Sequence, residues 1–193
     1  MSDDRLFAPW GVVSPGFWGL PVQGAAAGDG SAAPLEPQEQ LVPSGPPEAY
    51  RQRIETVTAA FGHAEDRARL VQAGVEAERL DQEIAAEFGE GHPHTVNIRE
   101  LRGWIAHLLG DHGLAARWYV HTTGLQMQAF GAEHDFTQAS AHRAYAMWKA
   151  VEDRSEILAV GSLLLPLLSA VEGESSKIAR AVRKRLDRLV SEG

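Results

Sequence analysis

The chain contains no cysteine, so a disulfide framework, a thiolate nucleophile and a cysteine-bound zinc ion are excluded. Basic residues are also few. Its 18 lysines and arginines stand against 26 aspartates and glutamates, which gives a formal net charge of −8 at pH 7. A chain with this charge is not expected to coat nucleic acid. At about 150 residues per domain, its 193 residues predict one domain and a tail.

A long hydrophobic run is also missing. The most apolar stretch, from Ile157 to Val171, has 15 residues, fewer than the ~20 that a membrane-spanning helix needs. Gly161 and Pro166 interrupt this stretch, so we interpret it as a buried helix. The acidic start, MSDDR, is not followed by the apolar core of a signal peptide. The expected location is therefore the cytoplasm.

Residues 1–46 form a tail that is rich in helix breakers, with seven of the ten prolines. Residues 23–46 are mostly Gly, Ala, Pro, Ser, Gln and Glu, which predicts a flexible linker. Residues 6–22 instead place large apolar side chains between prolines and glycines, which favours a segment that docks on a surface. The aromatic residues expected to contact that surface are Phe7, Trp10, Phe17 and Trp18.

Residues 47–193 show a helical pattern throughout, with apolar residues every three or four positions and no strand-like alternation. This pattern predicts an all-α domain. The predicted helices cover residues 48–61, 64–88, 95–109, 114–130, 136–151, 156–171 and about 176–190. Gly62, Gly89 and Gly131 are expected to end three of them, because glycine is common just after a helix.

The strongest signal is an internal repeat. The sequences FGEGHPHT (88–95) and FGAEHDFT (130–137) share Phe, Gly, His and Thr at a period of 42 residues. A further step of 42 residues reaches Gly173, again between two predicted helices. Each period holds a pair of helices, which is typical of a solenoid in which stacked pairs bury a common core.

At these residues the chain resembles the tetratricopeptide repeat, in the 42-residue form of the kinesin light chains. Gly103, Ala115 and Tyr119 stand at the positions of its small residue, its alanine and its packing aromatic, and His92 and His134 match its loop histidine. The resemblance covers roughly residues 48–190. It implies a short helix-pair solenoid with a C-terminal capping helix and a binding groove lined by the first helix of each pair.

The resemblance also implies which side chains line the groove. In the first well-matched pair they are Asn97, Glu100, Trp104, His107 and Leu108. In the next pair they are Ala139, His142, Ala146, Lys149 and Ala150. Glu100 and His142 stand where the family often has an asparagine that holds the ligand backbone. Independently of the family, residues three or four positions apart on a helix share one face.

Three positions depart from the family pattern. Arg102 stands where the first helix of a pair usually has a leucine. Ala106 replaces the aromatic in the first helix of one pair. Gly161 replaces the aromatic in the second helix of the next pair. Trp104 therefore either faces the groove or packs in place of the aromatic missing at position 106. Trp148 stands at the family's aromatic position and is expected in the core.

No pattern of catalytic or metal-binding residues is present. The eight histidines form neither HExxH nor ExxH, and the chain has neither a GxSxG elbow nor a GK[ST] phosphate loop. We therefore expect no metal, no cofactor and no enzymatic activity. The last helix is basic, since residues 174–193 carry a net charge of +3. Its Arg180, Arg183, Lys184 and Arg185 form either the polar face of a capping helix or a docking site for an acidic partner or nucleic acid.

These patterns predict an adaptor that binds a peptide or protein through the groove, the tail or both. The tail would dock either on another protein or back into its own groove. The alternative is a structural or regulatory subunit of a larger secretion, signalling or phage-like assembly, self-associating through the apolar helix at 156–171. The competing interpretation of that helix is burial between its neighbours.

Overall fold

The computed structural model describes residues 45–192. This part of the chain contains α-helices and two short 3-10 helices, η4 (Glu48–Tyr50) and η5 (Ala60–His63), and no strand. The α-helices are α1 (Arg51–Ala59), α2 (Arg67–Phe88), α3 (Pro93–Leu108), α4 (His112–Phe130), α5 (Asp135–Lys149), α6 (Arg154–Glu172) and α7 (Lys177–Ser191). The prediction of an all-α domain is confirmed. Residues 6–22 and most of the linker lie outside the described residues.

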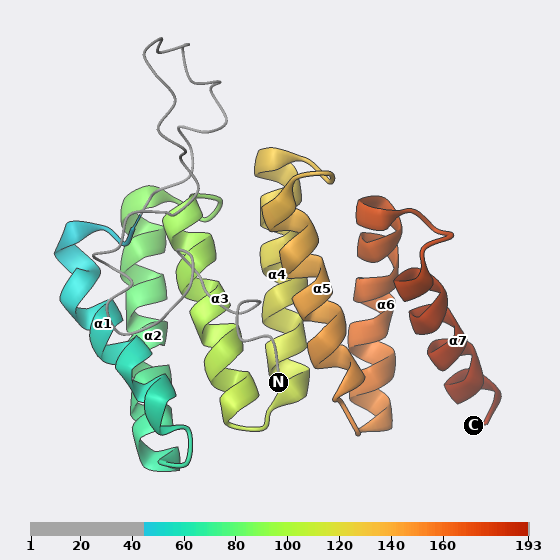
Figure 1. The fold of residues 1–193 in the computed structure, drawn as a ribbon, viewed down its shortest axis with the longest axis horizontal. Helices are drawn as coiled ribbons and strands as arrows, with labels where there is room; N and C mark the ends of the chain where they lie inside the picture. Colours follow the sequence, from blue (N-terminus) through green and yellow to red (C-terminus); the bar gives the residue numbers. More distant parts are fainter. Residues whose placement is uncertain (1–44, 193) are drawn as a thin grey trace, which may run out of the picture.

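The helices follow one another in space as they do in sequence (Figure 1). Each packs against the next, from α1 at one end to α7 at the other, and α4 also contacts α6. Neighbouring helices run in opposite directions because the loops between them are short. The structure places most of its contacts between sequence neighbours, so helices far apart in the sequence lie far apart in the molecule.

Three loops spaced by 42 residues share one backbone geometry. Gly89, Gly131 and Gly173 follow α2, α4 and α6 with φ values of 98°, 91° and 87°. Glycine adopts positive φ at little cost, whereas other residues are strained there. Each of these glycines donates its N–H to a carbonyl four residues earlier. Gly62, by contrast, lies inside η5 and is not among the glycines with positive φ, so its predicted role as a cap is wrong.

The helices that follow two of these loops begin in the same way. His92 and His134 are the N-caps of α3 and α5, and the Nδ1 atom of each accepts a backbone N–H two residues later. The Thr95 and Thr137 hydroxyls donate to the carbonyls of Gly89 and Gly131, at 2.7 Å and 2.9 Å. The repeated Gly, His and Thr of the sequence therefore all serve to turn the chain between helices.

The core shows how the chain compensates for its departures from the repeat. In one helix pair the buried aromatic is Tyr119 on α4, which packs against Gly103 on α3. In the next pair it is Trp148 on α5, which packs against Gly161 on α6. The buried aromatic thus lies on the second helix of the α3–α4 pair but on the first helix of the α5–α6 pair. In both pairs it packs against a glycine. Trp148 is 1% exposed, so its predicted place in the core is confirmed.

Matched glycine substitutions test this close packing. A Cβ atom at position 161 would lie 2.6 Å from Leu186 Cδ2 and 3.1 Å from Trp148 Nε1, whereas one at position 124 would meet nothing within 4 Å. We expect Gly161→Ala to be less stable than Gly124→Ala by about 1–3 kcal/mol, because overpacking costs that much. Urea unfolding measures both variants. Equal stability of the two would contradict the close contact.

Candidate functional site

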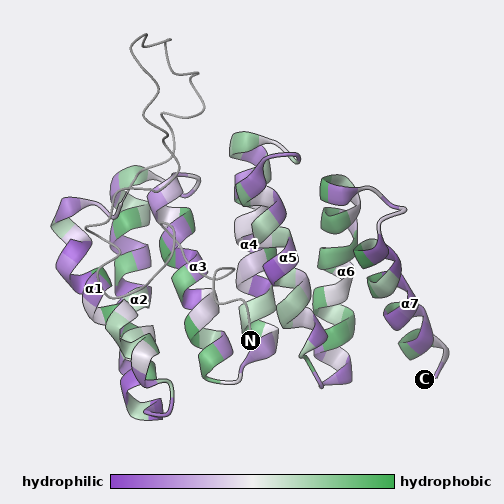
Figure 2. Ribbon diagram, in the orientation of Figure 1, coloured by the Kyte–Doolittle hydropathy of each residue, from purple (hydrophilic) through white to green (hydrophobic). Residues whose placement is uncertain are grey.

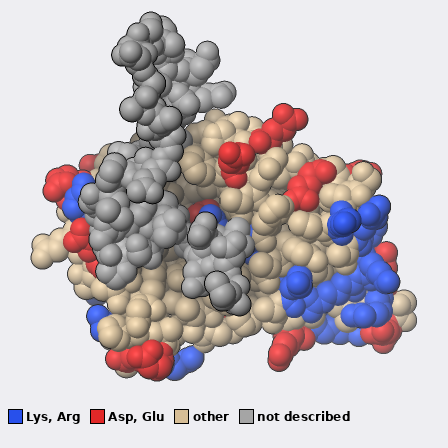
Figure 3. Space-filling model, viewed as in Figure 1, with Lys and Arg blue, Asp and Glu red and all other residues tan. Residues whose placement is uncertain are grey.

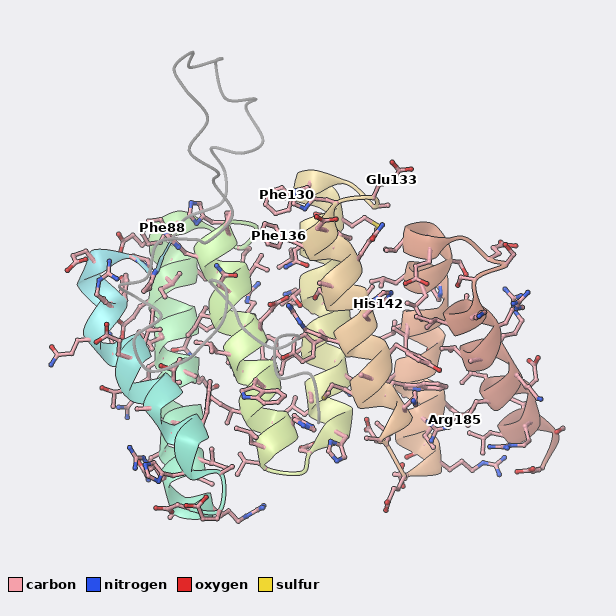
Figure 4. The ribbon with its side chains drawn as sticks, in the orientation of Figure 1. Phe88, Phe130, Glu133, Phe136, His142 and Arg185 are labelled. Atoms are coloured by element: carbon pink, nitrogen blue, oxygen red, sulfur yellow. The ribbon has the colours of Figure 1, made fainter. Side chains whose placement is uncertain are left out.

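The candidate site is the surface of α3 and α5 that the predicted groove residues form; we call it the α3–α5 surface. Asn97, Trp104, His107 and Leu108 are half-buried on α3, and His142 and Lys149 are exposed on α5. In Figure 4, His142 lies on α5 on the side of α6. The three- and four-residue spacing along α3 places its members on one face of that helix.

One end of this surface is lined by three neighbouring rings that are tilted relative to one another. The Trp104 and His107 ring centroids are 4.8 Å apart, and those of His107 and His112 are 5.2 Å apart. Burial, and to a smaller extent the neighbouring His112, lowers the pKa of His107, so this imidazole is neutral at pH 7. With Leu108 beside them, Trp104 and His107 form a neutral, partly apolar patch.

Glu100, which is predicted to line the groove, does not present a free carboxylate to it. It is 3% exposed and forms an ion pair of 2.7 Å with Arg143 on α5. Gln126 on α4 donates a second bond to the same carboxylate, at 3.2 Å. The reason is physical, since a buried carboxylate is stable only with charged and hydrogen-bonding partners. Glu100 therefore forms the floor of the α3–α5 surface.

This ion pair lies in a polar layer between two apolar clusters. One cluster joins α1, α2 and part of α3, and the other joins α4, α5, α6 and α7 with Ala106 of α3. The layer between them contains the buried polar side chains of Glu100, Thr122, Thr123, Gln126 and Ser140. Gln126 Oε1 is buried without a hydrogen-bond partner in the described part of the chain, so the layer retains one unsatisfied acceptor.

The predicted groove residues of α5 lie further along, toward α6. His142 Nε2 contacts the Glu172 carboxylate at the end of α6. Lys149 Nζ lies 5.6 Å from the centre of the Tyr145 ring on the same helix. The structure therefore divides the predicted groove into a neutral part on α3 and a charged part on α5 and α6, with the Glu100–Arg143 pair between them.

The predicted basic patch is only partly free. Arg180, Arg183 and Lys184 are exposed, and Figure 3 shows lysine and arginine side chains gathered over α7. Arg185 is instead half-buried. Its guanidinium donates to the carbonyls of Trp148, Lys149 and Val151 at the end of α5 and lies 4.6 Å from the Trp148 ring. Arg185 therefore caps α5, because a cation satisfies the free carbonyls at a helix C-terminus.

Helix α6 is buried on one face only, so its predicted burial is partly wrong. Figure 2 shows hydrophobic residues recurring along it. Leu164 and Leu168 are fully buried, whereas Leu163 is 53% exposed. With 19 residues, α6 is longer than predicted, and among the described helices it is the one long and apolar enough to cross a membrane by length and composition.

Two open cavities lie at the N-terminal end, away from the α3–α5 surface. The first, about 340 Å³, lies between α2 and α3 beside Asp81, Glu90 and Arg99. Its charges are already paired, since Arg99 and Arg102 bond Asp81 at 2.9 Å and 2.6 Å and Arg99 also contacts Glu90. The second, about 400 Å³, lies between α1 and α2. The described residues contain no cluster of three or more groups that could hold a metal ion.

The sequence did not lead us to Arg143 and Gln126 as the residues that bond Glu100. Arg143 has alanines one turn away in each direction on its own helix face, at positions 139 and 146. A single cation between such small apolar residues predicts a buried carboxylate partner, which was a usable signal. Gln126 gave no comparable signal. It occupies the position of Ile84 and Leu168, one period away in each direction, so only the three-dimensional contact with Glu100 explains it.

In comparisons with models of protein families, with curated proteins and with solved structures, the chain matches none of them. The resemblance to the tetratricopeptide repeat therefore remains an expectation from the residues themselves.

Paired arginine variants test the ion pair beneath the site. We expect Arg143→Met to lower the free energy of unfolding by about 3–5 kcal/mol, because it leaves the Glu100 carboxylate buried without its cation. Arg117→Met is the matched control. It breaks an exposed ion pair with Glu156 (2.9 Å) and should cost less than about 1 kcal/mol. Urea unfolding measures both, and equal losses would contradict the buried role of Arg143.

Proposed function

We propose that this chain is a non-enzymatic adaptor that binds an extended segment of a protein on the α3–α5 surface. The row of neutral, half-buried side chains on α3 carries this proposal, namely Trp104, His107 and Leu108. Tryptophan is enriched among residues that dominate binding energy, and its large ring offers contact area at little entropic cost.

The polar residues beside this row support the same function. The buried Glu100–Arg143 pair holds α3 and α5 together beneath the surface, so that its side chains are presented on a fixed backbone. An extended peptide backbone carries unpaired N–H and C=O groups, for which Asn97 on α3 and His142 on α5 are polar partners at the surface itself. Apolar side chains of the bound segment would pack on Trp104 and Leu108.

A selection from a random peptide display library with the full chain tests this function. Peptides that bind the native chain should lose at least about tenfold in affinity with Trp104→Ser/Leu108→Ser, because truncating an interface anchor costs 2 kcal/mol or more. The matched control is Val71→Ser/Val75→Ser, which removes two exposed apolar side chains from α2. The control should bind like the native chain. Selected peptides that bind both variants equally well would contradict the proposal.

A second candidate function, a self-associating subunit of a larger assembly, is favoured by the exposed side of α6. Its residues lie three or four positions apart in one stripe and carry no charge. They are Ala159, Ser162, Leu163, Pro166 and Ala170. A neutral stripe of this kind can pack against its own copy, because both partners present the same surface.

Sedimentation at several protein concentrations tests this candidate. Self-association through α6 predicts that the mean mass rises with concentration and that Leu163→Glu returns the protein to a monomer. Leu114→Glu on α4, at a position with 44% exposure, is the matched control and should leave the mass unchanged. A native chain that stays monomeric at every concentration would contradict self-association.

A further inference from the structure

We propose that residues 6–22 of this chain bind to the α3–α5 surface of the same molecule, where they compete with other segments for it. This inference rests on the function proposed above and specifies its regulation. Three observations favour residues 6–22 as the occupant of this surface. They are the composition of the segment, the reach of the linker and the position at which the described chain begins.

The composition of residues 6–22 indicates that their apolar side chains are buried against a surface outside the segment. These 17 residues contain no charged side chain, and nine of them are large and apolar. Three prolines and three glycines interrupt them, which excludes a regular helix. A segment this short cannot build a core of its own, since chains below about 40 residues rarely do. Its aromatic side chains are buried only if they pack against another surface.

The α3–α5 surface suits a neutral occupant. Trp104 and Leu108 offer apolar contact, the pKa of His107 is lowered, and the buried charges beneath are already paired. Residues 6–22 carry no negative charge with which the exposed cations of α7 could pair. In Figure 3, these cations gather at the far end of the molecule from α1.

The starting point of the described chain favours this surface over the stripe on α6. Residue 45 lies beside the start of α1, close to Arg51. With helix axes about 8–10 Å apart, α3 is roughly 20 Å from α1, whereas α6 lies several helices further along the row. The part of the linker that precedes the described chain, residues 23–44, has 22 residues. A flexible chain of this length spans about 25 Å on average, which is enough to reach α3.

Because the linker joins residues 6–22 to the helical domain, even a weak affinity of this segment would be sufficient for it to occupy the α3–α5 surface. A linker of this length gives an effective concentration of about 1 mM. A segment with a Kd of about 0.1 mM for the free peptide would then occupy the surface about nine-tenths of the time. A competing peptide would bind about tenfold more weakly to the native chain than to a chain whose tail is released.

Spin-label NMR on the full chain tests this inference. Because the native chain has no cysteine, Ser14→Cys places a single label inside the segment. We expect the label to broaden amide signals of α3 and α5 and to spare those of α7. Adding Trp10→Ser/Trp18→Ser should remove the broadening, while the matched linker change Leu35→Ser/Leu41→Ser should keep it. Broadening that spares α3 and α5 would overturn the proposal.

A mixing experiment separates the occupants. Isotope-labelled chain without the spin label is mixed with spin-labelled chain without the isotope, and no broadening is expected. Broadening of α3 and α5 in this mixture would show that a second copy is the occupant, which would overturn binding within one chain.

Peptide affinity then separates failure of this inference from failure of the proposed function. The Trp10→Ser/Trp18→Ser chain should bind the selected peptides about tenfold more tightly than the native chain does. If the affinities are equal while Trp104→Ser/Leu108→Ser still abolishes binding, the tail does not occupy the surface and the proposed function stands. If Trp104→Ser/Leu108→Ser binds the peptides like the native chain, the proposed function itself fails.

Discussion

The arrangement of the central helices depends on the ion pair between Glu100 and Arg143. A carboxylate with 3% exposure needs a partner charge, and here that charge comes from the helix 43 residues further along the chain. The pair fixes α5 relative to α3, and Gln126 of α4 completes it. It also lies between the two apolar clusters of the domain. The same two side chains that hold the helices together thus form the floor of the α3–α5 surface.

The sequence was sufficient for the helices because local signals agree with one another. The apolar period, the glycines after α2, α4 and α6, and the N-cap residues each indicate the same boundaries, so the predicted ends lie within three residues of the observed ones. Trp148 could also be placed in the core, since its position in the repeat is that of a packing aromatic. Gly62 was misjudged because a 3-10 turn extends α1 without requiring positive φ.

The site was harder to predict because side-chain pairing depends on residues far apart in the sequence. The repeat pattern places Glu100 on the groove face of α3, but it does not show that Arg143 and Gln126 converge on it. Arg185 has the same difficulty, since its three carbonyl partners lie more than 30 positions earlier. A run of basic residues therefore looked like one patch, although one of its members caps another helix.

The exchange of aromatic and glycine between neighbouring helix pairs constrains how such a chain can evolve. Tyr119 corresponds to Gly161 one period later, and Ala106 corresponds to Trp148. Changing a pair from one arrangement to the other needs at least these two substitutions. The first alone would either overfill the core or leave a cavity. The two positions of each pair are thus expected to show sign epistasis, so that either substitution is harmful alone and tolerated only together with the other.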